Sequence, residues 1–262
     1  MRPLSCLLLS ASAITVSQLG AQKPVENFRP PDVTRYESVL EKYVREDGKV
    51  NYAGIGTHPT DLSAFVAQIA AVSPNSAPGL FKNREAQLAY WLNAYNALVL
   101  QSFAADYPQK RDRLTGLVGR ASFFYRQKHK FGGKDRSLGD VEDNTIRKLF
   151  GEPRIHFALV CASASCPWLS RTAYTAENLD SHLEADAARY FSQARNFHMD
   201  ENKREVTLPR ILEWFKDDFG GTSEKVLAFV AKYRKDESAK LTKGAWRIRY
   251  FDYDWSPNDW RP

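Results

Sequence analysis

Residues 88–100 read Leu-Ala-Tyr-Trp-Leu-Asn-Ala-Tyr-Asn-Ala-Leu-Val-Leu and form the centre of the longest predicted helix, from about Lys82 to Asp106. This stretch is apolar almost all the way round, which is typical of a helix buried in a core. Asn93 and Asn96 lie three residues apart and therefore share one face of the helix. A buried amide without a partner costs roughly 1–3 kcal/mol. The two asparagines are thus expected either to fix a neighbouring loop or to line a substrate site.

A second apolar stretch, Ile155–Cys161, reads Ile-His-Phe-Ala-Leu-Val-Cys. It is apolar on both faces, which predicts a central strand covered on both sides. The order of predicted elements, helices first and then strands mixed with helices, favours an α+β fold. We expect residues 32–262 to form a helix-rich single domain packed on a small mixed or antiparallel sheet. Other helices are expected near 33–44, 60–69, 137–150, 176–191, 209–219 and 224–233, and other strands near 123–131, 205–208 and 246–253.

The composition is that of a globular protein and excludes a disordered chain. Of 262 residues, 43% are hydrophobic and 13% aromatic, which supplies the side chains of a sizeable core. The 37 basic residues exceed the 31 acidic ones by six, giving a formal charge of +6. This is a modest excess without a recognition motif, so we expect no nucleic-acid partner.

The first residues predict export. Arg2 precedes an apolar stretch from Leu4 to Val16, and small residues follow up to Ala21, so residues 1–21 have the layout of a cleaved signal peptide. A buried N-terminal helix is the alternative. Polar, proline-bearing residues 22–31 predict a linker. Because no other segment approaches the length needed to cross a bilayer, we expect a periplasmic or secreted protein without stable membrane insertion.

Cleavage removes Cys6 and leaves Cys161 and Cys166, which flank a loop of small residues, 162–165. Sites often lie where the chain leaves the carboxyl end of a buried strand, so this loop is the best candidate site. Pro167 favours the first position of a helix, which predicts Cys166 as its N-cap. Free N–H groups and the helix dipole at that place lower the pKa of a thiol. Cys166 is therefore the candidate nucleophile.

A thiol nucleophile normally needs a base, and His156 is the nearest histidine in the sequence. Alternation along the predicted strand places His156 and Cys161 on its opposite faces, whereas Cys166, beyond the loop, can fold back to either face. Glu142 or Asp140 can orient the histidine as a third member of the site. The alternatives are that His156 is a hydrogen-bonded core residue and that Glu142 pairs with Arg147 on a helix surface.

Other interpretations of the two cysteines stay open. With four residues between them in an exported chain, they also permit a structural disulfide, inert buried thiols or thiol–disulfide exchange. Two cysteines and one histidine leave a zinc site short of a ligand, so we expect no metal and no cofactor. The sequence also lacks phosphate-binding and serine-hydrolase motifs. The aromatic, acidic residues 250–255 are expected to cap the core rather than to bind sugar.

Four stretches together resemble a known family. They are Tyr-Trp-Leu-Asn-Ala-Tyr-Asn-Ala-Leu at 90–98, the segment 137–147 with Ser-Leu, Glu and Ile-Arg, the segment 156–167 with His-Phe-Ala-Leu-Val-Cys and Ser-Cys-Pro, and Tyr-Asp-Trp-Ser with Asn at 253–258. Over most of the mature chain the sequence is similar to the domain of unknown function 547, although Pro257 replaces the leucine of the family pattern. The resemblance implies a globular domain with these distinctive residues: Asn93, Asn96, Glu142, Arg147, His156, Cys161 and Cys166. Its helices, cysteines and histidine are also loosely similar to papain-like and transglutaminase-like hydrolases.

Together these patterns predict a cysteine-dependent hydrolase or acyl transferase that acts on a peptide-like or small-molecule substrate. In this hypothesis Cys166 is the nucleophile, ahead of Cys161, His156 is the base and Glu142 orients it. Asn93, Asn96 and Arg147 are the candidate substrate-binding residues, with an asparagine as a possible oxyanion donor. The alternative is a non-catalytic binding or structural module with a Cys161–Cys166 disulfide.

Overall fold

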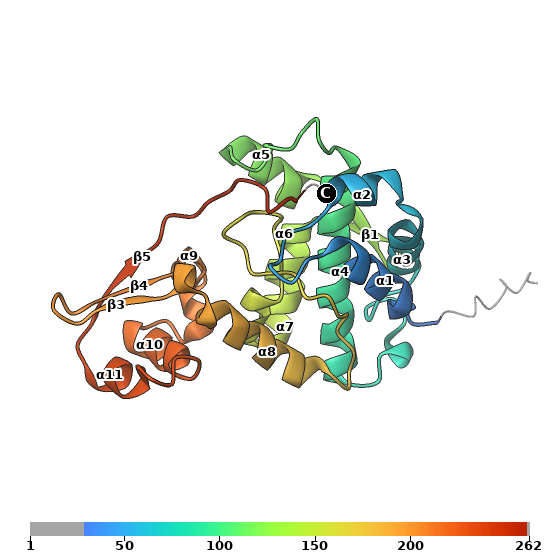
Figure 1. Ribbon diagram of the computed structural model, residues 1–262. Coiled ribbons are helices and arrows are strands. Elements are labelled where there is room, and N and C mark those ends of the chain that lie inside the picture. Colours follow the sequence, from blue (N-terminus) through green and yellow to red (C-terminus); the bar gives the residue numbers. More distant parts are fainter. Residues whose placement is uncertain (1–28, 261–262) are drawn as a thin grey trace, which may run out of the picture.

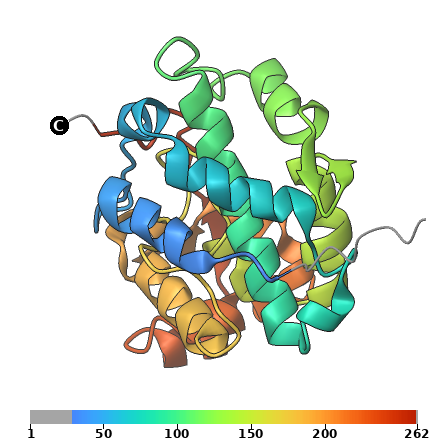
Figure 2. The ribbon, with the colours of Figure 1, turned by 90° about the vertical axis from the view of Figure 1, so that its right-hand side faces the viewer.

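Helix α4 (Arg84–Ala105) runs through the middle of the protein, and the other N-terminal helices pack around it (Figures 1 and 2). The structure is a computed structural model that describes residues 29–260. The predicted signal peptide and most of the predicted linker therefore lie outside the described residues. Helix α4 is buried along most of its length, as its apolar composition predicted.

The N-terminal elements are mostly helical. Asn83 caps α4 by accepting a hydrogen bond from the backbone N–H of Ala86. Up to residue 157 the elements are α1 Val33–Tyr43, α2 Tyr52–Thr57, α3 Thr60–Ala71, η1 Pro78–Leu80, α4 Arg84–Ala105, α5 Leu117–Ala121, η2 Ser122–Arg126, β1 His129–Phe131, β2 Lys134–Arg136, α6 Leu138–Val141, η3 Glu142–Arg147, α7 Lys148–Phe150 and η4 Pro153–Phe157. Strands β1 and β2 form an antiparallel hairpin.

The C-terminal elements form a smaller lobe with a three-stranded sheet (Figure 1, orange and red). Strand β4 is central, antiparallel to β3 and parallel to β5, so β3 and β5 are the edge strands of this sheet. The elements after residue 157 are α8 Leu179–Ser192, η5 Ala194–Asn196, β3 His198–Asp200, β4 Glu205–Leu208, α9 Arg210–Trp214, η6 Lys216–Phe219, α10 Ser223–Ala231, α11 Ser238–Lys243 and β5 Arg247–Tyr250. A helix-rich α+β fold with small sheets is therefore confirmed.

Two apolar clusters form the core, and the segment 153–161 lies between them. Ile155 and Ala158 belong to the larger cluster around α4. Phe157 belongs to the smaller cluster, which lies between α8, α10 and the three-stranded sheet. Residues 155–160 are therefore buried between the two clusters, which is why all of them except His156 are apolar.

The prediction of a strand at Ile155–Cys161 is wrong. Residues Pro153–Phe157 form the 3₁₀ helix η4, and the chain continues to Cys161 without pairing to a strand. Pro153 starts the helix, and the side chain of Glu152 accepts a hydrogen bond from the N–H of Arg154. The apolar run reflects burial between two clusters, and burial on both faces does not distinguish a strand from an irregular segment.

Side chains replace a neighbouring strand as hydrogen-bond partners of this segment. Asn96 on α4 donates from Nδ2 to the carbonyl of Ala158 at 2.9 Å and accepts from the N–H of Val160 at 3.1 Å. The N–H of Cys161 donates to the sulfur of Cys166 at 2.8 Å. These bonds satisfy buried backbone groups that a strand would have paired within a sheet.

Two other local predictions also differ from the structure. Residues 122–126, predicted as the start of a strand, form the π-helical turn η2, and only residues 129–131 of that stretch are extended. Cys166 does not cap a helix, because the next helix after Phe157 begins only at Leu179. Pro167 therefore lies in an extended loop, and the predicted helix dipole does not act on the thiol.

The C-terminal residues 251–260 run back from β5 to the N-terminal helices and cover the cysteine loop (Figure 1, dark red). The N–H of Ala164 donates to the carbonyl of Ser256 at 2.7 Å, and the N–H of Ser165 donates to the carbonyl of Asp254 at 3.1 Å. The last residues of the chain thus hold a loop that is about ninety positions earlier in sequence.

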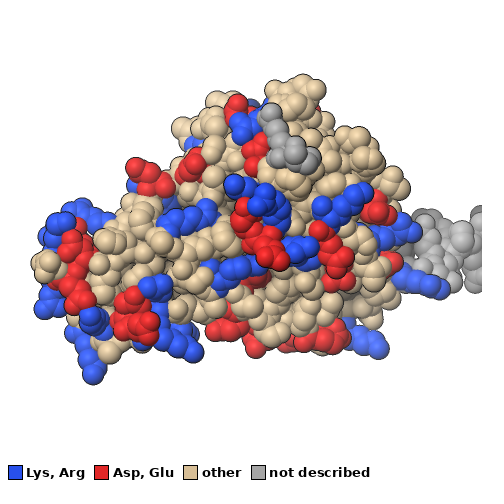
Figure 3. Space-filling model, viewed as in Figure 1, with Lys and Arg blue, Asp and Glu red and all other residues tan. Residues whose placement is uncertain are grey.

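On the face shown in Figure 3, lysine and arginine side chains are interspersed with aspartate and glutamate. This arrangement matches the modest formal charge of +6. Within residues 29–260, none of the helices combines the length and apolarity that crossing a bilayer requires.

We predict that Asn96→Ala lowers the free energy of unfolding by about 2–4 kcal/mol, because it leaves a buried carbonyl and a buried N–H without partners. Urea unfolding followed by circular dichroism measures this loss. Asn144→Ala is the control, since Asn144 is exposed and its side chain donates to Asp140 at the surface; its effect should stay within about 0.5 kcal/mol. Equal losses in both variants would contradict the role given to Asn96.

Candidate functional site

The loop from Cys161 to Cys166 brings two thiols into contact. Cys161 Sγ lies 2.8 Å from Cys166 Sγ, 3.0 Å from Ser163 Oγ and 3.2 Å from Tyr253 Oη. Ala162, between them, is fully buried and has a φ of 61°, which non-glycine residues rarely adopt. Such strained residues persist where the surroundings hold them in place and are common at functional sites.

The two thiols differ in acidity. Burial works to raise the pKa of Cys161, but hydrogen bonds with Cys166, Ser163 and Tyr253 outweigh it and hold the pKa below that of an ordinary thiol. Burial, followed by the bond to Cys161, raises the pKa of Cys166 well above its usual range. Cys161 is therefore the thiol that these contacts favour as a thiolate, although the sequence favoured Cys166.

The disulfide considered as an alternative is not formed. Both cysteines are free, and their sulfurs lie 2.8 Å apart, farther than the roughly 2.05 Å of a disulfide bond.

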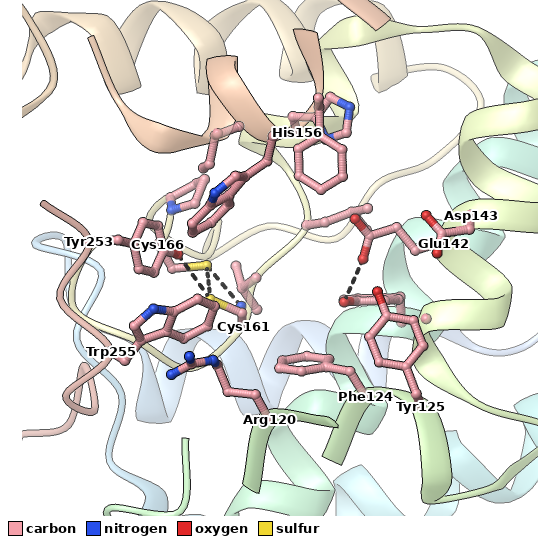
Figure 4. A pocket seen from close by; sticks show the side chains of 18 of the residues that line it. Arg120, Phe124, Tyr125, Glu142, Asp143, His156, Cys161, Cys166, Tyr253 and Trp255 are labelled. Atoms are coloured by element: carbon pink, nitrogen blue, oxygen red, sulfur yellow. Dashed lines mark hydrogen bonds between the residues drawn. The ribbon is translucent and has the colours of Figure 1, made fainter. Parts of the chain in front are cut away.

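A cavity of about 490 Å³ opens beside the two thiols (Figure 4). Its walls are mainly apolar and aromatic, and they come from α4, α5, η2, η3, the cysteine loop, α9 and the C-terminal segment. The lining includes Tyr95, Phe124, Tyr125, Trp214, Phe215, Tyr253 and Trp255, together with the charged residues Arg120, Glu142 and Asp143. In Figure 4 the sulfurs lie toward Tyr253 and Trp255, and the two carboxylates lie on another wall.

Glu142 is the acid whose protonation the cavity changes most. Burial raises the pKa of Glu142 to about 7, although a hydrogen bond from Tyr95 Oη at 2.9 Å works in the opposite direction. The charges of Glu142, Cys161 and Cys166 all act on Tyr95, whose own pKa burial raises well above its usual range. The carboxyl group and the thiols thus belong to one electrostatic environment.

Two π-helical turns shape the cavity. Turn η2 carries Phe124 and Tyr125, and turn η3 begins at Glu142. Such turns are rare and are frequent at functional sites. A side chain at Gly139 would meet the ring of Tyr125 at 2.3 Å from its Cβ, so only glycine allows this ring to lie against the carboxylate-bearing helix.

His156 lines the same cavity as the two thiols, but its hydrogen bond goes to an aspartate and not to a cysteine. Within residues 29–260 its ring bonds to Asp218 through Nε2 at 2.7 Å, stacks on Phe215 and bonds to no cysteine. Burial lowers the pKa of His156. The pKa of Asp218 is held well below its usual range by its hydrogen bond with His156 and, to a smaller extent, by its bond with Arg147. Glu142 does not orient His156, because its bond goes to Tyr95.

The three candidate substrate-binding residues all have protein partners. Asn93 bonds to both backbone groups of Tyr174, at 2.7 and 3.0 Å, in the way that Asn96 bonds to its own loop. Arg147 forms ion pairs with Asp143 and Asp218 at 2.6 Å. Neither these asparagines nor Arg147 line the cavity beside the thiols. Of the two roles considered for the asparagines, the geometry favours the fixing of loops.

Several residues of the site were not predicted as site residues from the sequence. Asp218, the partner of His156, lies 62 positions from it. Tyr253 belongs to the aromatic C-terminal segment, which was predicted to cap the core but also contacts Cys161. Arg120 lies with its guanidinium 4.2 Å from the ring centre of Trp255 and donates to two backbone carbonyls. Among the described residues, no group of three His, Cys, Asp or Glu side chains is arranged to hold a metal ion.

Comparison with known proteins identifies one family. Residues 80–191 match the family described as "Protein of unknown function, DUF547". No curated protein and no solved structure matches the chain significantly. The matched range includes Glu142, Cys161 and Cys166, whereas Tyr253 and Trp255, which complete the cavity, lie beyond it.

We predict that the raised pKa of Glu142 makes the protein less stable, relative to Glu142→Gln, as pH rises from near 4.5 to about 7. In this window the folded state holds a proton that the unfolded state has lost, so stability falls by up to about 3 kcal/mol. Urea unfolding of both proteins at pH 5 and pH 8 gives the difference. Glu41→Gln, at an exposed position, is the control and should follow the original protein at both pH values. If the free energy of unfolding changes equally between pH 5 and pH 8 in the original protein and in Glu142→Gln, the raised pKa of Glu142 is ruled out.

We also predict that Tyr253→Phe raises the pKa of Cys161, because it removes a hydrogen bond to the sulfur and keeps the ring. The rate of alkylation by iodoacetamide as a function of pH reports this pKa. Tyr250→Phe, on strand β5, is the matched control and should leave the profile unchanged. An unshifted profile for Tyr253→Phe would show that its hydroxyl does not stabilise the thiolate.

Proposed function

We infer from the match over residues 80–191 that the chain is a member of the DUF547 family, and from the site itself we propose that the protein is a cysteine-dependent hydrolase or acyl transferase with Cys161 as nucleophile. The observation that carries the proposal is the sulfur of Cys161, which faces an apolar cavity and is held by three hydrogen-bonding neighbours. A thiolate stabilised in this way is a nucleophile without a base in contact with it.

Glu142 supplies the proton transfers in this proposal. Its pKa of about 7 leaves it partly protonated near neutral pH, which suits a group that acts as acid in one step and as base in the next. The base role that the sequence suggested for His156 passes to Glu142, because Asp218 already occupies Nε2 of the histidine. His156 and Asp218 then act as supports, since they hold Phe215 at the cavity wall.

In the proposed reaction these groups act in two stages. The Cys161 thiolate attacks the carbonyl carbon of an ester, thioester or amide, and the leaving group departs with a proton from the Glu142 carboxyl. This forms a thioester on Cys161. The Glu142 carboxylate then takes a proton from water, or from an acceptor alcohol or amine, which attacks the thioester and releases the acyl product and the thiolate.

The cavity indicates the class of substrate. A volume of about 490 Å³ with aromatic walls fits the acyl or aryl part of a small molecule or a short peptide-like chain. Exposed apolar side chains continue this surface at the mouth, where Leu117 is 77% exposed and Trp214 is 46% exposed. The guanidinium of Arg120 is fixed against Trp255, so it offers a preset positive charge to a polar substituent of the substrate.

We predict that Cys161→Ala abolishes turnover of p-nitrophenyl esters, with longer acyl chains preferred over acetate in the original protein. Cys166→Ala should retain measurable turnover but need a higher pH, because it removes a hydrogen bond that favours the Cys161 thiolate. Initial rates across pH measure both effects, and circular dichroism confirms that each variant is folded. Equal loss in the two variants would contradict the assignment of Cys161. Binding of apolar esters without turnover in the original protein would instead favour a non-catalytic binding module.

We expect Glu142→Gln to lower kcat/KM by roughly 10²–10⁴-fold for alkyl esters and anilides, whose leaving groups need a proton. The loss should be much smaller in the acylation of Cys161 by a p-nitrophenyl ester, because nitrophenolate leaves without protonation. Glutamine keeps the size of the side chain and can still accept the bond from Tyr95. Equal losses with both classes of leaving group would assign Glu142 a structural role only.

A further inference from the structure

The pairing of the two thiols has no use in acyl transfer beyond one hydrogen bond, yet it matches a second chemistry. We infer that the protein also reduces organic hydroperoxides, with Cys161 oxidised to a sulfenic acid and Cys166 converting it to an intramolecular disulfide. This inference does not depend on acyl transfer, because it uses only the two sulfurs and the apolar cavity.

The short distance between the two sulfurs is the first observation that supports this inference. A disulfide needs roughly 2.05 Å between sulfurs, so from 2.8 Å they must approach by only about 0.8 Å. Both cysteines lie on one short loop, and the N–H of Cys161 already bonds to the sulfur of Cys166. The C-terminal segment holds the loop at Ala164 and Ser165, so the two thiols remain neighbours.

The two thiols also differ in the way that this chemistry requires. Oxidation by peroxide begins at a thiolate that the oxidant can reach, and a second thiol nearby then completes the disulfide. Cys161 is only partly buried and has the lowered pKa, whereas Cys166 is 4% exposed and stays protonated. Cys161 is therefore the thiol that is attacked first, and Cys166 is the one that resolves it.

The cavity selects the oxidant. Both sulfurs line a space of about 490 Å³ whose aromatic walls include Phe124, Trp214 and Trp255. An aryl or alkyl hydroperoxide buries its organic part in this space, whereas hydrogen peroxide has nothing to bury there. The hydroxyls of Ser163 and Tyr253 lie beside the Cys161 sulfur, where they can bond to the peroxide oxygens.

The steps balance as follows. The Cys161 thiolate attacks the terminal oxygen of the hydroperoxide, the O–O bond breaks, and the alkoxide takes up a proton from solvent and leaves as an alcohol. The sulfur of Cys166 then attacks the sulfenic sulfur of Cys161, and the hydroxyl group leaves with the Cys166 proton as water. Two equivalents of an external thiol reduce the resulting disulfide, which regenerates both thiols and releases an oxidised external disulfide.

The test uses the full chain with Cys6→Ser, so that Cys161 and Cys166 are the only cysteines whose oxidation is measured. One equivalent of cumene hydroperoxide is added to the reduced protein, and thiol titration with peptide mass mapping follows the two cysteines. We expect both thiols to be lost together and the Cys161 and Cys166 peptides to be linked. The reaction should be at least about tenfold faster than with hydrogen peroxide. With excess dithiothreitol, the protein should consume cumene hydroperoxide over repeated cycles.

Two variants separate the roles of the thiols. Cys166→Ser should stop at a sulfenic acid on Cys161, which dimedone traps as an adduct of that peptide. Cys161→Ser should slow the loss of the remaining thiol by at least about tenfold. Oxidation of Cys161 to sulfinic acid without a linked peptide would overturn the inference, and so would reaction no faster than that of the denatured chain. Ester turnover is assayed separately, so either activity can be absent while the other is present.

Discussion

The structure depends on the hydrogen bonds that two asparagine side chains form with the backbone of segments outside any β-sheet. Asn96 satisfies a carbonyl and an N–H of the segment that leads into Cys161, and Asn93 does the same at Tyr174. Both amides belong to α4, which is buried along most of its length. A buried irregular segment is stable only when its polar groups are paired, so these two residues allow a loop to run through the core.

That loop explains why the site has its electrostatic character. A strand would have paired its backbone groups with a neighbouring strand, whereas here Cys161 donates its N–H to the sulfur of Cys166. The two thiols are consequently held together in an apolar environment, where hydrogen bonds decide which of them loses its proton. Glu142 lies in the same environment, where burial raises its pKa and the hydrogen bond from Tyr95 offsets that rise only in part.

The second lobe and the chain terminus complete the site. Trp214 at the end of helix α9 and Phe215 directly after it line the cavity, and the C-terminal segment contributes Tyr253 and Trp255. The same segment is anchored beyond the site, where Tyr52 donates to Asn258 at 2.7 Å. Residues beyond the matched family range therefore close a cavity whose reactive groups lie within that range. Differences in these outer residues would change the walls of the cavity while leaving the thiols and the carboxyl group in place.

The sequence by itself determined the buried helix around residues 88–100 and the α+β class, because periodicity and residue type are local properties. It misassigned Ile155–Cys161, since burial on both faces produces the same apolar run in a strand and in a loop between two clusters. Only the tertiary structure decided which thiol is the more acidic, that His156 belongs to Asp218, and that Tyr253 reaches Cys161. These outcomes depend on contacts between residues far apart in the chain, and the acidity of a group is set by its neighbours in space rather than by its neighbours in sequence.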